Sequence, residues 1–139
     1  MRITLESDYA LRIVTTLAED RGLLDAKAIS DKTLVSQKFA LKILRKLTIG
    51  GVVSSYKGAK GGYMLKRTPD EITLKQVIEL IDGPIVIARC LEGTEECTLN
   101  PDKSSCVFHH IFDSISIDVA RKLSKITIRD ILTKEYSLS

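Results

Sequence analysis

The sequence predicts a mainly α-helical fold with a small β-hairpin wing, arranged as a winged helix-turn-helix followed by a long C-terminal dimerisation helix. Three observations lead to this prediction. Three short segments in the first half have apolar residues at helical spacing. Two runs rich in β-branched and aromatic residues come next, separated by the glycine-rich stretch KGAKGG. A longer segment in the second half has a wide apolar stripe.

The first two helices are short, and polar residues mark their starts. Apolar spacing predicts a helix over residues 8–19, with Ser7 or Asp8 as its N-cap and an end near Arg21. Asp25 is suited to cap a second helix, because its carboxylate can accept a hydrogen bond from an unpaired backbone N–H of the first turn. A third helix is expected to follow these two.

The third helix is expected over residues 36–49, with Ser36 as its N-cap and two glycines after its end. Its apolar positions form one stripe, which we expect to be buried. Leu41 falls among the basic residues of another face, where an apolar residue is unexpected. The stripe consists of Phe39, Ala40, Ile43, Leu44 and Leu47, and the basic face carries Lys38, Lys42 and Arg45.

A β-hairpin is expected after the third helix. The runs Val52–Tyr56 and Tyr63–Arg67 have the composition of strands, and the glycine-rich turn between them carries Lys57 and Lys60. Three short helices followed by a hairpin with a basic tip make a winged helix-turn-helix. We therefore expect residues 1–68 to form a DNA-binding region.

Residues 69–139 are expected to form a sensor and dimerisation region. Thr73 caps a helix that ends at Gly83, and residues 90–105 form a loop. A long helix should run from about Ser105 to Lys125, and its stripe is large for so small a domain, which predicts packing against a second copy. The closing ITIRDIL is expected to form a strand or a short helix.

Charge is distributed unevenly along the chain. Residues 36–67 contain eight lysines and arginines and no acidic residue, whereas the following segment to residue 106 is mainly acidic. A solvated basic face is the simpler interpretation, but the helix, the basic hairpin and the missing acids together favour double-stranded DNA as the partner. The residues expected to contact DNA are Ser36, Gln37, Lys38, Lys42, Arg45, Lys57 and Lys60.

The three cysteines are the second chemical feature, spaced Cys90-x6-Cys97-x8-Cys106, with His109 and His110 close behind. Three soft thiolates near one loop favour an iron–sulfur cluster or zinc, and the lack of paired C-x-x-C knuckles counts against zinc. The alternative is that the cysteines are inert small apolar residues. His110 is expected to have only a surface or interface role.

Other function classes find little support. The sequence has no nucleophile paired with a general base and no phosphate-cradling motif, so we expect no enzyme. Its start, with Glu6 and Asp8, is not expected to act as a signal peptide, and no stretch approaches the ~18 apolar residues that a membrane span needs. Its odd number of cysteines argues against a disulfide framework. We expect a cytoplasmic protein that does not enter a membrane.

The chain resembles the IscR/NsrR/CymR (Rrf-type) family of bacterial winged-helix transcriptional regulators, in particular its iron–sulfur branch. The resemblance covers nearly the whole length. It rests on MRIT and SDYALR near the start, LVSQKFALKILRKLTIGGVVSSYKGAKGGYML, ITLKQVIELIDG, the three-cysteine loop and the closing ITIRDIL. The stretch GGVVSSYKGAKGGYML is the most specific of these.

The resemblance implies a homodimer held by the long helix, which recognises a near-palindromic operator with its third helix and wing. It also implies a 2Fe–2S or 4Fe–4S cluster on Cys90, Cys97, Cys106 and one further ligand. The IscR-like pattern makes that ligand His109, which we favour, and the NsrR-like pattern makes it Asp8 of the partner subunit. Such a regulator would sense redox state, nitric oxide or iron–sulfur supply. The alternative is a cluster-free member that senses thiol oxidation or a small ligand.

Two departures from the IscR-like pattern matter. The cysteine spacings of six and eight residues are wider than in IscR-like members, so the cluster geometry is expected to differ. Leu41 also stands where those members carry an acid in the recognition helix. Because an acid there would repel phosphates and an apolar residue does not, the operator preference should differ as well.

Overall fold

A computed structural model describes residues 2–93, 97–98 and 102–139. Over these residues the chain forms six α-helices and one two-stranded antiparallel sheet. The helices and strands are α1 (Leu5–Asp20), α2 (Ala26–Thr33), α3 (Gln37–Ile49), β1 (Val53–Tyr56), β2 (Gly62–Leu65), α4 (Leu74–Asp82), α5 (Val107–Lys125) and α6 (Ile128–Thr133). The predicted fold class, mainly α-helical with a β-hairpin wing, is confirmed.

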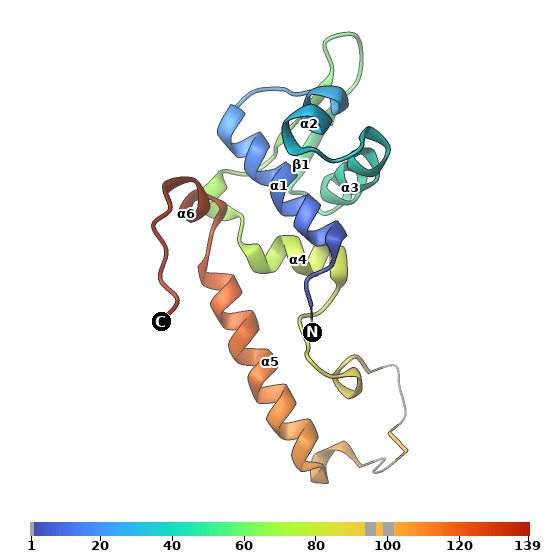
Figure 1. Cartoon of the computed structure of the whole chain (residues 1–139), viewed down its shortest axis with the longest axis vertical. Coiled ribbons are helices and arrows are strands. Elements are labelled where there is room, and N and C mark those ends of the chain that lie inside the picture. Colours follow the sequence, from blue (N-terminus) through green and yellow to red (C-terminus); the bar gives the residue numbers. More distant parts are fainter. Residues whose placement is uncertain (1, 94–96, 99–101) are drawn as a thin grey trace.

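The molecule has two parts of different thickness (Figure 1). We call residues 2–82 and 126–139 the head, and α5 together with the described part of residues 83–106 the stalk. The head gathers five of the helices and the hairpin, whereas α5 extends away from it beside the segment that follows α4 (Figure 1). None of the described helices is long and apolar enough to span a membrane.

The core of the head is built from the apolar stripes of its helices. On α3, four residues of the predicted stripe are fully buried, namely Ala40, Ile43, Leu44 and Leu47, whereas Phe39 is only partly buried against the core. These side chains meet α1, whose buried side chains include Ile13, Val14 and Leu17. Burying one large aliphatic side chain stabilises a fold by roughly 1.5–3 kcal/mol, so this shared core holds α1 and α3 at a defined angle.

The start of α1 differs from the prediction. Thr4 is the N-cap, and its hydroxyl accepts a hydrogen bond from the Ser7 backbone N–H at 3.1 Å. Ser7 is fully buried and Asp8 lies in the first turn, so neither is the cap. A carboxylate in the first turn is favourable because the helix N-terminus carries partial positive charge. The predicted caps Asp25 and Ser36 are confirmed, accepting from Ala28 N at 2.8 Å and from Phe39 N at 3.3 Å.

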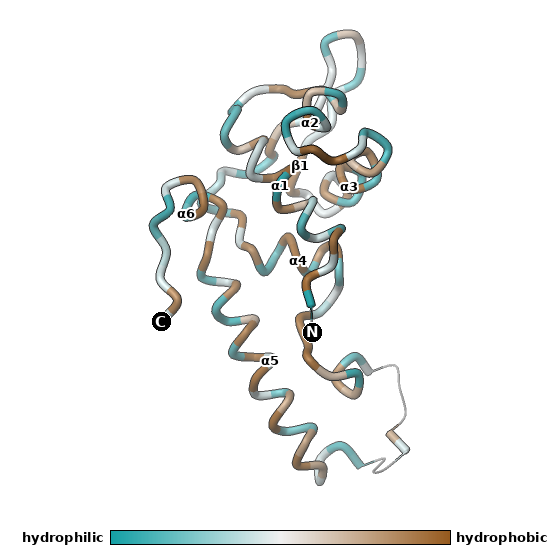
Figure 2. The backbone as a smooth tube through the Cα atoms, viewed as in Figure 1, coloured by the Kyte–Doolittle hydropathy of each residue, from teal (hydrophilic) through white to brown (hydrophobic). Residues whose placement is uncertain are grey.

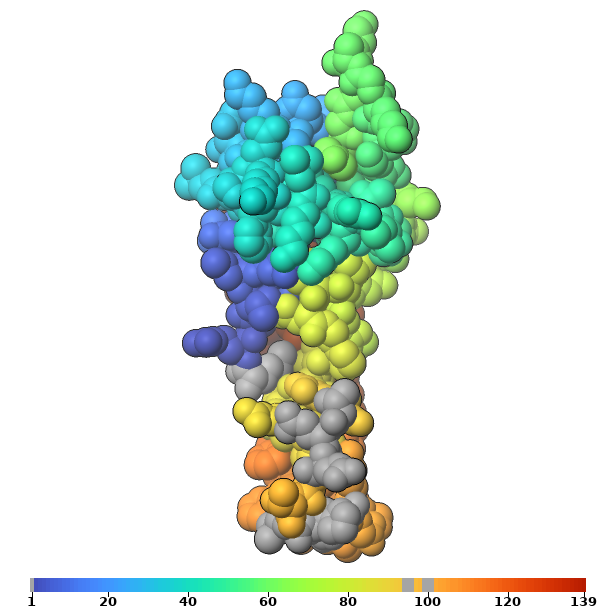
Figure 3. All heavy atoms as spheres, turned by 90° about the vertical axis from the view of Figure 1, so that its right-hand side faces the viewer, coloured from blue at the N-terminus to red at the C-terminus, as the bar shows by residue number. Residues whose placement is uncertain are grey.

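The hairpin forms close to its expected position. Its register pairs Val53 with Leu65 and Tyr56 with Gly62, and Leu24 adds an isolated bridge to Tyr63. A side chain at Gly62 would lie 2.5 Å from the Leu24 carbonyl oxygen, so this close approach of two backbones requires glycine. The loop between the strands projects beyond the rest of the head as a wing (Figures 1 and 3).

Backbone hydrogen bonds fasten the segment that follows the stalk to the rest of the head. Leu74 N donates to Ile126 O at 2.9 Å, and Ile128 N donates to Ile72 O at 2.9 Å. Thr73 caps α4 with a capping box, as its position predicted, and Thr127 does the same for α6. The closing segment is therefore a short helix rather than a strand.

The stalk is thin, and much of its apolar surface is exposed. α5 begins at Val107 rather than at Ser105, because residues 103–105 form a separate 3-10 turn. Ser116 accepts a hydrogen bond from Ile87 N at 3.0 Å and thereby fastens the preceding segment to α5. Apolar residues recur along α5 (Figure 2), and the exposed ones are Val107, Phe108, Ile111, Ile115 and Ile117.

Candidate nucleic-acid interface and candidate metal centre

The outer face of α3 carries the predicted polar and basic residues. Each of them is exposed, and the buried stripe on the opposite side of α3 fixes their direction. A helix with this face fits the width of the B-DNA major groove. The exposed residues at the N-cap and along the first turns are Ser36, Gln37, Lys38, Lys42 and Arg45.

An acidic residue that sequence reasoning missed lies beside this face. Glu6 of α1 is within 3.8 Å of the Lys42 ammonium and 2.6 Å of the Lys46 ammonium. Lys42 also lies 5.5 Å from the centre of the Phe39 ring. Glu6 is far from the basic window in sequence, so only the packing of α1 against α3 reveals the pair. Its negative charge orients the two lysines and offsets part of their positive charge.

Leu41 lies among these bases and is 42% exposed, as the helical spacing predicted. An exposed leucine on a basic face can contact the methyl group of thymine, since that methyl lies in the major groove. Its exposure supports a role at the surface rather than in the core.

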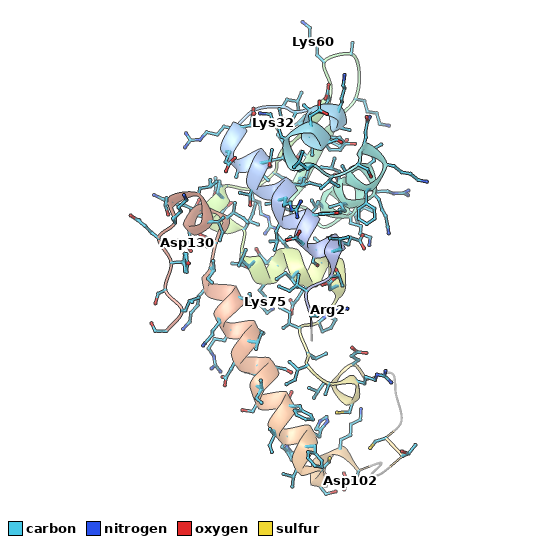
Figure 4. The ribbon with its side chains drawn as sticks, viewed as in Figure 1. Arg2, Lys32, Lys60, Lys75, Asp102 and Asp130 are labelled. Atoms are coloured by element: carbon cyan, nitrogen blue, oxygen red, sulfur yellow. The ribbon has the colours of Figure 1, made fainter. Side chains whose placement is uncertain are left out.

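The wing carries the other two predicted residues. Lys57 and Lys60 are both exposed in the loop between β1 and β2. Lys60 lies at the projecting tip, at the opposite end of the molecule from Asp102 (Figure 4). Gly58 has a φ of 104°, a conformation that favours glycine and allows the loop to turn tightly. A narrow basic loop of this kind can follow a minor groove.

The stalk contains a small cavity of about 170 Å³, and all three cysteines line it. His109 lines it as well, as does the ring of Phe112. The remaining lining residues are Ala88, Arg89, Lys103 and Phe108. Cys106 is the N-cap of α5, so His109 lies one turn along the helix and can turn toward the same cavity.

Hydrogen bonds order the walls of this cavity. Lys103 donates from its ammonium to the Cys90 carbonyl oxygen at 3.0 Å, which joins the two sides of the loop. A ring nitrogen of His110 lies 2.6 Å from the Ser104 carbonyl oxygen. His110 is exposed and does not line the cavity, in agreement with the plain role expected for it. Hydrogen bonds from the Ser104 side chain and backbone lower the pKa of Asp102, which therefore stays ionised as the cap of this turn.

The chain is similar throughout its length to known transcriptional regulators. A family model described as "Rrf2: Iron-dependent Transcriptional regulator" matches residues 3–134. The chain belongs to the Rrf2 family. The members of this family are transcriptional regulators, so this Rrf2 protein is a regulator and not an enzyme, as the sequence predicted.

Individual relatives agree with this assignment. NsrR of Oceanobacillus iheyensis is 27% identical over 141 residues, covering 99% of this chain and 94% of that protein. IscR of Sodalis glossinidius is 26% identical over 140 residues, covering 99% and 82%. The solved structure of CymR, the global cysteine regulator of B. subtilis, has 29% identity, a TM-score of 0.73 and coverage of 96% and 98%. The resemblance to this family is confirmed.

The residues that line the cavity supply the donor types that the implied cluster needs, three thiols and an imidazole. The Nδ1 atom of His109 is buried and has no hydrogen-bond partner among the described residues. A buried imidazole nitrogen that has no hydrogen-bond partner, on a residue lining the same cavity as three thiols, is suited to bind iron. No group of three or more His, Cys, Asp or Glu side chains within residues 2–93, 97–98 and 102–139 is arranged to hold a metal ion. The cysteines therefore share one cavity without converging on a single point.

Asp8, the alternative ligand, lies elsewhere in this Rrf2 protein. Its carboxylate pairs with Arg12 at 2.8 Å on α1, and it is not among the residues that line the cysteine cavity. Residues 94–96 and 99–101, which belong to the predicted cysteine loop, lie outside the described residues. Sequence analysis did not predict that Arg89 and Lys103 line the cysteine cavity. Their positions in the sequence, next to Cys90 and three residues before Cys106, could have suggested it.

Proposed function

We propose that this Rrf2-family protein is a cytoplasmic homodimer that binds a near-palindromic operator, and that an iron–sulfur cluster controls its affinity for DNA. In this proposal residues 1–68 bind the operator and residues 69–139 carry the cluster and the dimer contact. The single observation that carries the sensor half is the cavity shared by the three cysteines and His109. The basic α3 face and wing carry the DNA half.

The proposed DNA contacts follow from the exposed surface. Lys38, Lys42 and Arg45 on α3 would meet phosphates and base edges in the major groove, and Ser36 and Gln37 would read bases at its start. Lys57 and Lys60 on the wing would reach the adjacent minor groove. Such contacts make affinity strongly dependent on salt, because each neutralised phosphate releases counterions.

Fluorescence anisotropy with labelled duplex DNA tests the DNA half. Lys38→Ala and Lys57→Ala should each weaken binding and reduce the slope of log affinity against log salt by about one. Lys75→Ala is the matched control, since this lysine lies on α4 and pairs with Glu79 at 2.8 Å. An unchanged salt slope in both α3 and wing variants would refute the proposed interface.

The homodimer is proposed from the exposed apolar face of α5. Phe108 is 63% exposed and Ile111 48% exposed, and with Val107 and Ile115 they give a stripe longer than isolated surface residues usually make. If this stripe packs against the same stripe of a second copy, the resulting dimer carries two heads. Each head would then bind one of the two half-sites of the operator.

In the proposed sensor site, Cys90, Cys97 and Cys106 hold the cluster and His109 supplies the fourth bond. When bound, an iron–sulfur cluster supplies redox chemistry that oxygen and nitric oxide can alter. The residues of this chain order the site: Lys103 joins its two sides through the Cys90 carbonyl, and Phe112 adds apolar surface to its wall. The ratio of iron and sulfide to protein distinguishes a 2Fe–2S from a 4Fe–4S cluster.

Anaerobic absorption spectroscopy with iron and sulfide analysis tests the sensor half. The wild-type protein should be coloured, and Cys97→Ala should lose this absorbance while gel filtration still shows a folded dimer. His109→Ala and Asp8→Ala then decide the fourth ligand, because only loss of the true ligand should shift the spectrum. Full absorbance in Cys97→Ala would refute the assignment.

A cluster-free regulator is the second candidate. It is favoured by the finding that, among the described residues, no cluster of His, Cys, Asp or Glu side chains is arranged to bind a metal ion. In that case the cysteines would respond to oxidation, or the protein would bind a small ligand. A colourless anaerobic preparation whose three thiols all react with a thiol reagent would favour this candidate.

A further inference from the structure

A second, larger cavity of about 570 Å³ lies in the head. Its walls come from four places that are far apart in sequence: the end of α1, strand β2, the 3-10 turn Pro69–Glu71 and α6. None of its lining residues belongs to α3, to the wing tip or to the cysteine cavity. Pockets that bind small molecules commonly have volumes of roughly 300–1,000 Å³, so this one is large enough for a metabolite.

The lining combines an apolar floor with a strong excess of positive charge. Leu17, Leu65 and Leu132 provide apolar surface, and three arginines stand around it. The arginines are Arg21, Arg67 and Arg129, and the only acidic residue among the lining residues is Asp70. The net charge of the lining is therefore +2. The carboxyl ends of α1 and α6 each contribute about half a negative charge, which leaves room for roughly one anionic group.

Arg67 is the most enclosed of the three arginines, because it is half-buried whereas Arg21 and Arg129 are exposed. Its Nε atom is buried and has no hydrogen-bond partner in the part of the chain that the structure describes. A buried guanidinium N–H without a partner is costly, because the group has lost its water without gaining another acceptor. An anion in the cavity would bind the outer nitrogens of this guanidinium and offset its charge, since guanidinium groups bind carboxylates and phosphates through paired hydrogen bonds.

Asp70 does not provide that acceptor. Hydrogen bonds from the Thr68 side chain and from its own backbone lower the pKa of Asp70, and the nearby charge of Arg129 lowers it further. Asp70 is therefore ionised at neutral pH, is engaged with its own turn, and offsets part of the charge of Arg129. The positive charges of Arg21 and Arg67, and the part of the Arg129 charge that Asp70 does not offset, remain available to a ligand.

We propose that this cavity binds a small organic anion, with a carboxylate or phosphate at the arginines and an apolar part against the leucines, and that the ligand acts on the wing. Met64 and Leu65 of β2 line the cavity, and they pair with Ser54 and Val53 of β1. The α6 wall adjoins Ile126 at the end of α5. A ligand would thus contact strand β2 at the base of the wing and α6, the helix that follows the stalk in sequence, at once.

Isothermal titration calorimetry on the full chain tests the binding step without DNA. The probes are benzoate and phenyl phosphate, with benzyl alcohol as the uncharged match and inorganic phosphate as the anion without an apolar part. We expect benzoate or phenyl phosphate to bind, with the better of the two identifying the anionic group, and the other two probes to bind at least tenfold more weakly. Failure of both aromatic anions, or equal binding of benzyl alcohol, would overturn the proposal.

Variants locate the site. Arg67→Gln and Arg129→Gln should each weaken the better probe about tenfold, since each removes a charge-assisted hydrogen bond. Arg129 is exposed, so its variant keeps the test valid if Arg67→Gln fails to fold. Lys27→Gln is the control, because it removes one exposed positive charge from α2, outside the cavity. Unchanged affinity in both folded arginine variants would refute this location.

The regulatory step has its own readout. Adding the better probe should change the DNA affinity of the wild-type protein several-fold, and Arg129→Gln should need about tenfold more probe for the same change. Binding without any change in DNA affinity would refute the action on the wing. These results stand apart from the operator and cluster proposals, because probe binding is measured without DNA and requires no iron.

Discussion

The head and the stalk differ in how they bury apolar surface. In the head, the side chains of Ile13, Leu44 and Ile128 are fully buried, and most of the other buried aliphatic residues of the described chain surround them. In the stalk, the only buried residues among those described are Ile85 and Ser116. The head is therefore completed by its own residues, whereas the stalk leaves an apolar face exposed, where the proposed dimer contact would lie.

Exposed apolar residues also differ between the two parts. Leu34, 85% exposed, and Ile49, 78% exposed, stand on different elements of the head, and single apolar residues on a surface are normal. On α5, by contrast, Phe108, Ile111 and Ile115 follow one another at helical spacing. Exposed apolar residues are therefore unremarkable where they stand alone, but they indicate a candidate interface where they recur at helical spacing.

The largest expected effect is on the core of the head. Leu44→Ala should lower the free energy of unfolding by about 2–5 kcal/mol, because it removes buried methyl groups and leaves a cavity in the fully buried centre of α3. Denaturant unfolding followed by circular dichroism measures this loss. Leu41→Ala, on the exposed face of the same helix, is the control and should change stability by less than about 1 kcal/mol. Similar losses in both variants would contradict a self-sufficient head core.

The next effect should appear in the stalk and should concern assembly. Ile111→Asp combined with Ile115→Asp should weaken dimerisation at least a hundredfold, or about 2.7 kcal/mol, because two charges would be buried at the contact. Sedimentation equilibrium measures the dissociation constant, and circular dichroism should show that the head remains helical.

Ile117→Asp is the matched control for that change. Ile117 is 50% exposed but lies about 200° around the helix from Ile115, at 100° per residue, so it points away from the proposed contact. A control variant that dissociates as readily as the double variant would move the contact to another face of α5.

The smallest effect should appear where the two parts join. Thr73→Ala should cost about 1 kcal/mol, since it removes the hydroxyl that accepts from Gln76 N at 3.1 Å in the capping box of α4. Thr73→Ser retains that hydroxyl and should restore most of the stability. Thermal unfolding of the three proteins compares them, and equal loss in both variants would show that the methyl group rather than the cap matters.

Much of the head could be predicted from local sequence signals. The caps Asp25, Ser36 and Thr73 were found because a short polar side chain before an apolar stripe has one common structural role. The cap of α1 was missed because three successive polar positions compete near Ser7, and only burial of Ser7 against the core selects Thr4. The closing segment ITIRDIL was ambiguous for a different reason, because seven residues are too few to show a period.

The candidate sites were predictable in composition but not in arrangement. Spacing indicated that Cys106 and His109 share a face of one helix, and both line the same cavity. Spacing could not show that Glu6 pairs with Lys42 and Lys46, because α1 and α3 meet only after the core forms. The arginine cavity was equally invisible, since Arg21, Arg67 and Arg129 belong to three separate elements.

The helical stripes, the basic hairpin, the cysteine spacing and membership of the Rrf2 family could all be recognised in the amino-acid sequence, because each depends on residues close together in the chain or on a pattern along its whole length. Which charges meet, which cavities form and which apolar face stays uncovered became known from the folded chain alone. Those features arise from contacts between residues distant in sequence, and such contacts depend on how the packed helices are oriented rather than on any local pattern.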